Sequence, residues 1–229
     1  MRFPDPMTLI VAHRGASGHA IENSLTAFRK AVEARADGVE LDARASADGV
    51  IVIHHDADLP AGRIAALPYE RIRGHRLANG EPIPRLEEAL DVLGDRCHAY
   101  IEIKGMAPAC DTALFAAIDA SPAPDRCHVH AFDHRIIKRL TSARPSLEAG
   151  ILSSSYPVDP VAPMKTAGAS DLWMEQSMVD RELVQRVHAA DGRVFAWTTD
   201  APRRWRELIE YGVDAICTNQ PAEARSTIG

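Results

Sequence analysis

The sequence lacks the features that mark several large classes of protein. Its four cysteines lie far apart, with no CxxC pair and no Cys/His spacing typical of structural zinc, so we expect reduced thiols in a cytoplasmic chain. No apolar run is long enough for a membrane span, and the first residues contain no signal-peptide core. We therefore expect neither secretion nor membrane insertion.

An excess of positive charge is also missing. The 26 Lys and Arg residues are outnumbered by 32 Asp and Glu residues, which gives a net charge of −6, and no basic stripe carries interleaved aromatics. Nucleic acid is therefore not an expected partner. Neither a GxGxxG pattern nor a P-loop pattern follows the first strand-like run, which argues against dinucleotides and nucleoside triphosphates.

Strand-like runs alternate with amphipathic segments along the whole chain. Because 46% of the 229 residues are hydrophobic and no Gly/Ser-rich or Pro-rich linker interrupts them, we expect a single domain over residues 1–229. Strands are predicted at residues 8–12, 38–44, 98–104, 127–131, 147–152, 171–174, 193–198 and 212–218, and helices at 24–34, 84–93, 133–142, 180–190 and 202–211. This alternation favours an α/β fold, the (β/α)8 TIM barrel, over a doubly wound open sheet.

Two segments depart from the simple alternation. Residues 50–54 follow an Asp48-Gly49 turn and predict a hairpin extension of the second strand. Residues 56–81 have weak periodicity and scattered Gly, Pro and Arg, so they predict a long loop or a small insertion. On a barrel, such a segment is expected to lie over the site.

Carboxylates and a lysine gather at the ends of two predicted strands. Glu40 and Asp42 are two residues apart and therefore point to the same side of their strand, as do Glu102 and Lys104 in the next. Neighbouring carboxylates are costly unless a cation lies between them. Barrel enzymes keep their chemistry at strand carboxyl ends, and oxygen ligands favour one divalent ion, Mg²⁺ or Ca²⁺. The alternative is that Glu102 and Lys104 merely neutralise each other in a polar barrel mouth.

Other candidates are less specific when each is taken alone. Arg14 ends the first strand-like run and could hold a phosphate or carboxylate, although a surface arginine is the simpler interpretation. His13 and His55 could face one another as an acid–base pair, although either could be a structural or exposed histidine. Trp197 could wall a substrate pocket or belong to the core or a lid. No role is assigned to the other eight histidines.

The residues before the first long helix add two further candidates. Asn23 is expected to cap that helix, because its side chain can accept a hydrogen bond from a backbone N–H in the first turn. Glu22 could reach a metal ion or a substrate hydroxyl.

Short motifs spread over nearly the whole chain make the set of candidates specific. In order they are His13-Arg14-Gly15, Glu22-Asn23-Ser24, Val39-Glu40-Leu41-Asp42, His55-Asp56, Glu102-Ile103-Lys104, Trp197-Thr198 and Gly212-Val213-Asp214-Ala215-Ile216. On these motifs the chain resembles the glycerophosphodiester phosphodiesterases. The resemblance implies a (β/α)8 barrel of the phospholipase-C-like phosphodiesterase type.

The resemblance also implies a role for each matching residue. Histidines at the positions of His13 and His55 act as general acid and base in that family, and the residues matching Arg14 and Lys104 bind the phosphate. Trp197 is expected at the substrate pocket. The divalent ion, Mg²⁺ or Ca²⁺, is held by the carboxylates of Glu40, Asp42 and Glu102.

The chain departs from the family pattern at three places. Ile21 stands where the family usually has proline, and Asn219 stands where it commonly has aspartate. Residues 56–81 are shorter than the usual insertion and lack its Thr-rich opening. Since that insertion helps to grip the glycerol arm, the alcohol of the substrate is less well specified than the reaction.

These implications favour metal-dependent hydrolysis of a small phosphodiester, such as glycerophosphocholine, to glycerol 3-phosphate and an alcohol. Such esters are deacylated phospholipid head groups, so a place in lipid metabolism is expected, and the choice between lipid turnover and phosphate scavenging stays open. Two alternatives stay open. A neighbouring substrate hydroxyl could attack and release a cyclic phosphate, as in lyase-type relatives, or the barrel could bind a phosphorylated metabolite without turnover. The native ion and the oligomeric state stay open as well.

Overall fold

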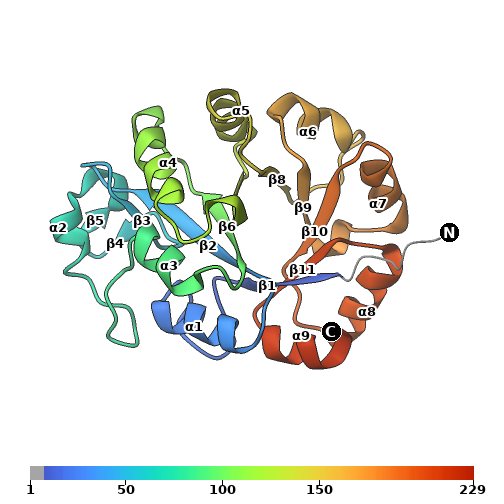
Figure 1. Ribbon diagram of the computed structural model, residues 1–229, viewed down its shortest axis with the longest axis horizontal. Helices are drawn as coiled ribbons and strands as arrows, with labels where there is room; N and C mark the ends of the chain where they lie inside the picture. Colours follow the sequence, from blue (N-terminus) through green and yellow to red (C-terminus); the bar gives the residue numbers. More distant parts are fainter. Residues whose placement is uncertain (1–7) are drawn as a thin grey trace.

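A closed barrel of parallel strands forms the centre of the molecule (Figure 1). The computed structural model describes residues 8–229, and residues 1–7, where no signal-peptide core was expected, lie outside them. The barrel strands are β1 (Leu9–His13), β2 (Gly38–Ala45), β6 (His98–Ile103), β7 (Cys127–Ala131), β8 (Ala149–Ser153), β9 (Asp171–Glu175), β10 (Arg193–Trp197) and β11 (Ala215–Thr218). Because β1 pairs with both β11 and β2, the sheet closes on itself, and the predicted TIM barrel is confirmed.

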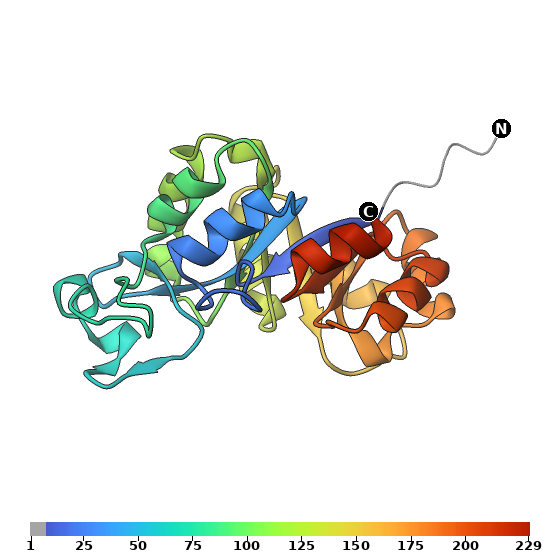
Figure 2. The same ribbon diagram turned by 90° about the horizontal axis from the view of Figure 1, so that it is seen from below.

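Helices follow the barrel strands and surround the sheet (Figures 1 and 2). They are α1 (Leu25–Glu33), α3 (Leu86–Leu93), α4 (Asp111–Asp119), α5 (His134–Ala143), α6 (Val161–Ala167), α7 (Arg181–His188), α8 (Pro202–Tyr211) and α9 (Pro221–Ile228). Helices α4, α6 and α9 were not among the predicted ones. Alanine-rich α4 and α9 offer little contrast between apolar and polar faces, and Pro163 interrupts the pattern of α6. Within residues 8–229, no helix has the length and apolar character needed to cross a bilayer.

The first helix begins one residue later than expected. Ser24, and not Asn23, is its N-cap, because the Ser24 hydroxyl accepts a hydrogen bond from the Ala27 backbone N–H at 3.1 Å. Asn23 has a positive φ of 56° and turns its side chain toward Asp42 on β2. The sequence pattern could not distinguish two adjacent capping residues, because the choice depends on a contact with another strand.

Buried apolar side chains form two layers because they alternate along each strand. Ile10 and Ala12 on β1 pack outward in the layer beneath the helices, whereas Val11 packs inward. The interior also contains Trp173 and Phe195, whose rings stack with centroids 4.6 Å apart. The barrel is therefore filled with side chains, so pockets form at its ends and not along its axis.

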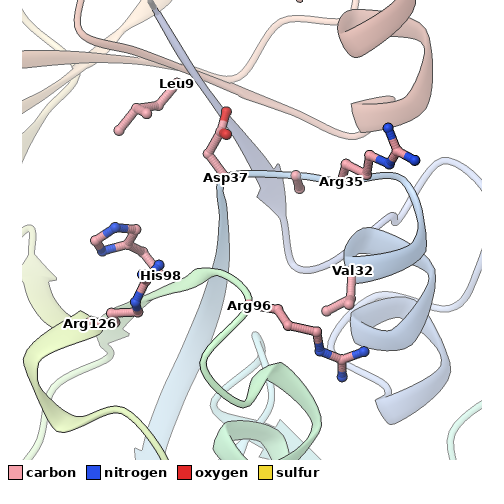
Figure 3. A pocket seen from close by; sticks show the side chains of 8 residues that line it. Leu9, Val32, Arg35, Asp37, Arg96, His98 and Arg126 are labelled. Atoms are coloured by element: carbon pink, nitrogen blue, oxygen red, sulfur yellow. The ribbon is translucent and has the colours of Figure 1, made fainter.

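A pocket of about 460 Å³ lies at the amino-terminal ends of the strands (Figure 3). It is lined by Leu9 at the start of β1, by Asp37 just before β2 and by His98 at the start of β6.

A small unit built on β3 (Ile51–Ile53) lies beside the barrel (Figures 1 and 2). As predicted, β3 pairs antiparallel with β2 as a hairpin extension. The following segment contains β4 (Asp58–Leu59), β5 (Gly62–Arg63), a 3₁₀ turn (Ile64–Ala66) and α2 (Tyr69–Ile72).

The expected position of residues 56–81 over the site is not observed. Leu59, Ile64 and Ile72 pack in one cluster with Val52 of β3 and with Ile83, so the apolar side of the segment covers the hairpin. The segment lines a neighbouring groove of about 470 Å³ instead of the pocket at the barrel mouth. Its apolar residues decide this position, because they need a buried surface.

The environments of the four free cysteines predict their reactivity. Burial raises the pKa of the Cys97 thiol to about 11 and also raises the pKa values of Cys127 and Cys217, whereas Cys110 is partly exposed. We expect a disulfide reagent to modify Cys110 rapidly in the native protein and all four thiols after unfolding. Loss of the rapid phase in Cys110→Ser checks the assignment, and a second rapid thiol in the parent would contradict it.

Candidate active site

The candidate residues meet at the carboxyl ends of the barrel strands, as parallel pairing requires. His13 at the end of β1 lies beside Glu40 of β2, and Asp42 of β2 lies beside Glu102 of β6. A pocket of about 110 Å³ is lined by most of the predicted site residues: His13, Arg14, Glu40, His55, Glu102, Lys104 and Trp197. Asp42 is fully buried and does not line the pocket.

Asp42 is the centre of a buried charge network. Its carboxylate lies 3.1 Å from Lys104 Nζ and 3.1 Å from Arg14 Nε, and it accepts a hydrogen bond from the Asn23 amide at 2.7 Å. Burial alone would raise the pKa of Asp42, but Lys104 and Arg14 hold it below its usual value. Lys104 also contacts Glu102 at 2.7 Å, so one ammonium group bridges two strands.

The pKa values of the other two carboxylates, Glu40 and Glu102, are shifted in the opposite direction. Burial and the neighbouring charges of Asp42 and Glu102 raise the pKa of Glu40 well above its usual value. Burial also raises the pKa of Glu102, although Lys104 opposes the shift. Two cations, Arg14 and Lys104, thus face three carboxylates. A site with this excess of negative charge favours a further cation.

The geometry provides a place for such a cation. Glu40, Glu102 and His130 each offer one ligand atom, and these atoms lie within 4.8 Å of one another. Glu40 Oε1 and His130 Nδ1 are buried without any hydrogen-bond partner among the described residues. These unpaired atoms fit a metal ion, since buried polar atoms are otherwise hydrogen-bonded. Asp42, the third ligand implied by the resemblance, is not in this group.

Asn219 orients the ring of His13 from the far end of the sequence. The Asn219 Oδ1 atom lies 2.8 Å from His13 Nδ1 and accepts a hydrogen bond from the Ser17 hydroxyl, while its amide nitrogen donates to Asp200. An amide oxygen only accepts, so this network places the His13 proton on Nδ1 and leaves Nε2 free. Burial lowers the pKa of His13, and the bond to Asn219 opposes the shift.

His55 and His54 are adjacent but have different environments. His55 lines the pocket, and its Nδ1 lies 2.8 Å from the Asp56 carboxylate. His54 is not among the pocket residues, and its ring contacts the backbone carbonyl of Asp56 at 3.1 Å. The structure therefore places the predicted member of the pair at the site.

Arg44 of β2 joins the backbone of His55 to that of Lys104. Its Nε atom donates to the His55 carbonyl at 3.0 Å, and its Nη1 atom donates to the Lys104 carbonyl at 3.2 Å. Sequence reasoning missed this role, because both acceptors are backbone atoms that leave no motif. The guanidinium holds two pocket residues from different segments in one relative position.

Replacing Arg44 tests this positioning. We expect Arg44→Gln to lower kcat about 10²-fold, because a displacement of about 1 Å in a reacting group has a cost of that order. Arg63→Gln is the matched control, since Arg63 borders the same groove but contacts only Asp58 and should keep parental turnover. Parental kcat in Arg44→Gln would show that the two backbone segments hold their places without it.

Glu22 is a partner of Arg14. Both Glu22 carboxylate oxygens accept hydrogen bonds from Arg14 Nη1 at 2.9 Å, and Glu22 is outside the group of possible metal ligands among the described residues. The reach of Glu22 to a metal ion or to a substrate hydroxyl stays a prediction. The Glu22 carboxylate orients the guanidinium that lines the pocket.

Aromatic side chains form one wall of the pocket. Trp197 at the end of β10 packs edge-to-face against Phe132 with ring centroids 5.5 Å apart, and both line the pocket. Deeper, His130 stacks on Trp173 at 4.2 Å and 3° between ring planes. The role of Trp197 as a pocket wall was predicted. Phe132, His130 and Trp173 were not assigned, although His130 follows His128 at strand spacing.

The combination of barrel and site defines a class of enzyme. Arg14 and Lys104 offer positive charge at a small pocket that also holds two imidazoles. Such groups suit a substrate whose charge lies on a phosphate and whose bond breaks by proton transfer. The class that these features define is a barrel phosphodiesterase.

Comparisons with known proteins narrow the class to a family. The glycerophosphoryl diester phosphodiesterase family model matches residues 13–223. The glycerophosphodiester phosphodiesterase of Caldanaerobacter subterraneus subsp. tengcongensis is 30% identical over 231 residues, which cover 93% of this chain and 95% of that protein. The chain belongs to the glycerophosphoryl diester phosphodiesterase family and is a phosphoric diester hydrolase.

Solved structures have the same fold. A glycerophosphodiester phosphodiesterase from Parabacteroides distasonis superimposes with a TM-score of 0.89 at 24% identity, over 98% of each chain. A phosphodiesterase from Oleispira antarctica, in complex with the product sn-glycerol-3-phosphate, gives a TM-score of 0.86 at 24% identity over 97% of each chain. Both are similar to this chain over nearly their whole lengths.

Proposed function

We propose that the chain hydrolyses glycerophosphodiesters to glycerol 3-phosphate and an alcohol, with one divalent cation and with His13 and His55 as the acid–base pair. The observation that carries the proposal is the meeting of both imidazoles, both cations and two carboxylates in one pocket of about 110 Å³. The product bound to the Oleispira antarctica relative supports the glycerol phosphate arm.

Arg14 and Lys104 bind the phosphate in this proposal. Both side chains line the pocket, and both are held in place by carboxylates, Arg14 by Glu22 and Lys104 by Glu102. Positive groups fixed before the reaction stabilise the negative charge that grows on the phosphoryl oxygens. Trp197 supports the substrate from the side of β10.

The two histidines transfer protons on opposite sides of the phosphate. Nδ1 of His13 is held by Asn219 and Nδ1 of His55 by Asp56, so Nε2 is the nitrogen available on each ring. One imidazole takes a proton from the attacking hydroxyl or water, and the other gives one to the leaving alcohol. Histidine suits both roles because its usual pKa lies near neutrality.

The acidic residues hold the divalent cation in the proposal. Glu40 and Glu102, whose oxygens belong to the possible ligand group, would hold it, joined by Asp42 in the set that the resemblance implies. When bound, such an ion supplies Lewis-acid stabilisation of the phosphoryl oxygens. Mg²⁺ and Ca²⁺ are the ions expected from an oxygen-only ligand set.

Release of glycerol 3-phosphate tests the proposal. We expect the purified protein to release it from glycerophosphocholine and glycerophosphoethanolamine with added divalent metal, and to lose this activity in EDTA. Phosphorus NMR of the product separates hydrolysis from the lyase-type alternative, which would give a cyclic phosphate. Turnover unaffected by EDTA would refute the requirement for a metal ion. No release of glycerol 3-phosphate with any metal would refute glycerophosphodiesters as the substrate class.

A further inference from the structure

His130 of β7 lies against the two carboxylates that define the cation site. Parallel pairing places it next to Glu102 of β6, and one ring nitrogen belongs to the group of ligand atoms within 4.8 Å that also includes Glu40 and Glu102. The residue is only 1% exposed. Its Nδ1 atom has no hydrogen-bond partner among the described residues, and neither does Glu40 Oε1.

The surroundings of His130 favour one orientation of its ring. The ring lies flat on Trp173, with centroids 4.2 Å apart and 3° between the planes, and it lines the pocket. A buried imidazole that is held beside two carboxylates can bind a metal ion through a ring nitrogen.

Asp42 does not compete for the same position in this structure. Asp42 Oδ1 has no hydrogen bond but lies 3.1 Å from Lys104 Nζ, and Asp42 Oδ2 contacts Arg14 and Asn23. Glu40 Oε1 and His130 Nδ1 have neither a hydrogen bond nor an ion-pair partner among the described residues. Without a cation, unpaired buried polar atoms beside carboxylates are unfavourable. The buried atoms that most need a cation thus belong to Glu40 and His130, which share the ligand group with Glu102.

We propose that His130 is a nitrogen ligand of the divalent cation, so that this chain prefers a first-row transition ion such as Co²⁺ over Ca²⁺. The proposal rests on the metal site of the proposed function and adds a ligand to it. Imidazole nitrogen binds borderline transition ions, whereas Ca²⁺ and Mg²⁺ are bound almost entirely by oxygen. An imidazole nitrogen added to the carboxylates therefore changes ion selectivity.

Binding of Co²⁺ and Ca²⁺ to the substrate-free protein, measured by calorimetry, tests this preference. We expect His130→Gln to weaken Co²⁺ binding at least about 10-fold while changing Ca²⁺ binding little, since even an outer-shell partner has an effect of that order. His128→Gln is the matched control. His128 is a buried histidine of the same strand with an unpaired Nδ1, but it bonds to His98 and lies outside the ligand group.

A second measurement needs no folded variant at position 130. Pulsed electron paramagnetic resonance of the Mn²⁺-loaded parent should detect a directly bound imidazole nitrogen, and the signal should persist in His13→Gln and in His55→Gln. Persistence in both variants assigns the nitrogen to His130, because within residues 8–229 it is the histidine of the ligand group. Absence of the nitrogen coupling, or its loss in either variant, would overturn the proposal.

The outcomes separate this inference from the proposed function. If His130→Gln keeps the parental ratio of Co²⁺ to Ca²⁺ affinity, His130 is not a ligand, and EDTA-sensitive release of glycerol 3-phosphate still supports the hydrolase. If the parent binds neither ion, the inference and the metal part of the proposed function both fail. In that case, the release of glycerol 3-phosphate is the remaining test of the hydrolase activity.

Discussion

Replacing His55 by glutamine is expected to lower kcat about 10²- to 10⁴-fold, the range for loss of a general acid or base. The imidazole lines the pocket and is oriented by Asp56, so its removal takes away one of the two proposed proton-transfer groups. His54→Gln is the matched control, because His54 precedes it in the same loop and bonds only to a backbone carbonyl. His54→Gln should keep parental turnover.

Steady-state release of glycerol 3-phosphate from glycerophosphocholine, with saturating metal, measures both variants. Thermal unfolding confirms that each is folded. If His54→Gln abolished turnover while His55→Gln were silent, the choice between the two neighbours would be reversed. Loss in both variants would mean that the loop, and not one imidazole, is required.

Lys104→Met should have opposite effects on turnover and on metal binding. Loss of a fixed cation at the phosphate is expected to lower kcat about 10²- to 10³-fold. The same ammonium lies 3.1 Å from Asp42 and 2.7 Å from Glu102, so its removal frees carboxylates for a divalent ion. We therefore expect tighter metal binding in a less active enzyme.

The same substitution should destabilise the metal-free protein. Removing one partner of a buried ion pair leaves the other uncompensated, which typically costs about 3–5 kcal/mol of the free energy of unfolding. Lys104→Arg keeps the charge and is the control for both measurements. Urea unfolding and calorimetric metal titration check the prediction. Weaker metal binding in Lys104→Met than in the parent would show that the ammonium does not compete with the ion.

Part of the site was predictable because it follows from strand geometry. Side chains two apart share a face, so Glu40 with Asp42 and Glu102 with Lys104 could be placed together from their spacing alone. The carboxyl ends of parallel strands meet at one mouth of a barrel, so both pairs could be predicted to lie at the same mouth. The alternation of strands and amphipathic helices likewise predicted the closed barrel.

Other parts of the site depend on contacts between distant segments. Asn219 holds His13 across 206 positions of the chain, and Arg44 binds the backbone carbonyls of His55 and Lys104. The periodicity of hydrophobic residues along the chain cannot predict contacts between such distant residues. The N-cap of α1 likewise depends on a distant contact. The Asn23 side chain bonds to Asp42 of β2, and Ser24 therefore caps the helix.

The sequence by itself determined the fold class, the family and the set of groups at the mouth, because side-chain alternation and motif order are local properties. The contacts among those groups follow from the tertiary structure: Asp42 lies against two cations, whereas His130 Nδ1, near Glu40 and Glu102, has no hydrogen-bond partner among residues 8–229. The tertiary structure also placed residues 56–81 beside the mouth. The physical reason is that closing the barrel fixes the register of strands far apart in the chain, and register decides which charges are neighbours.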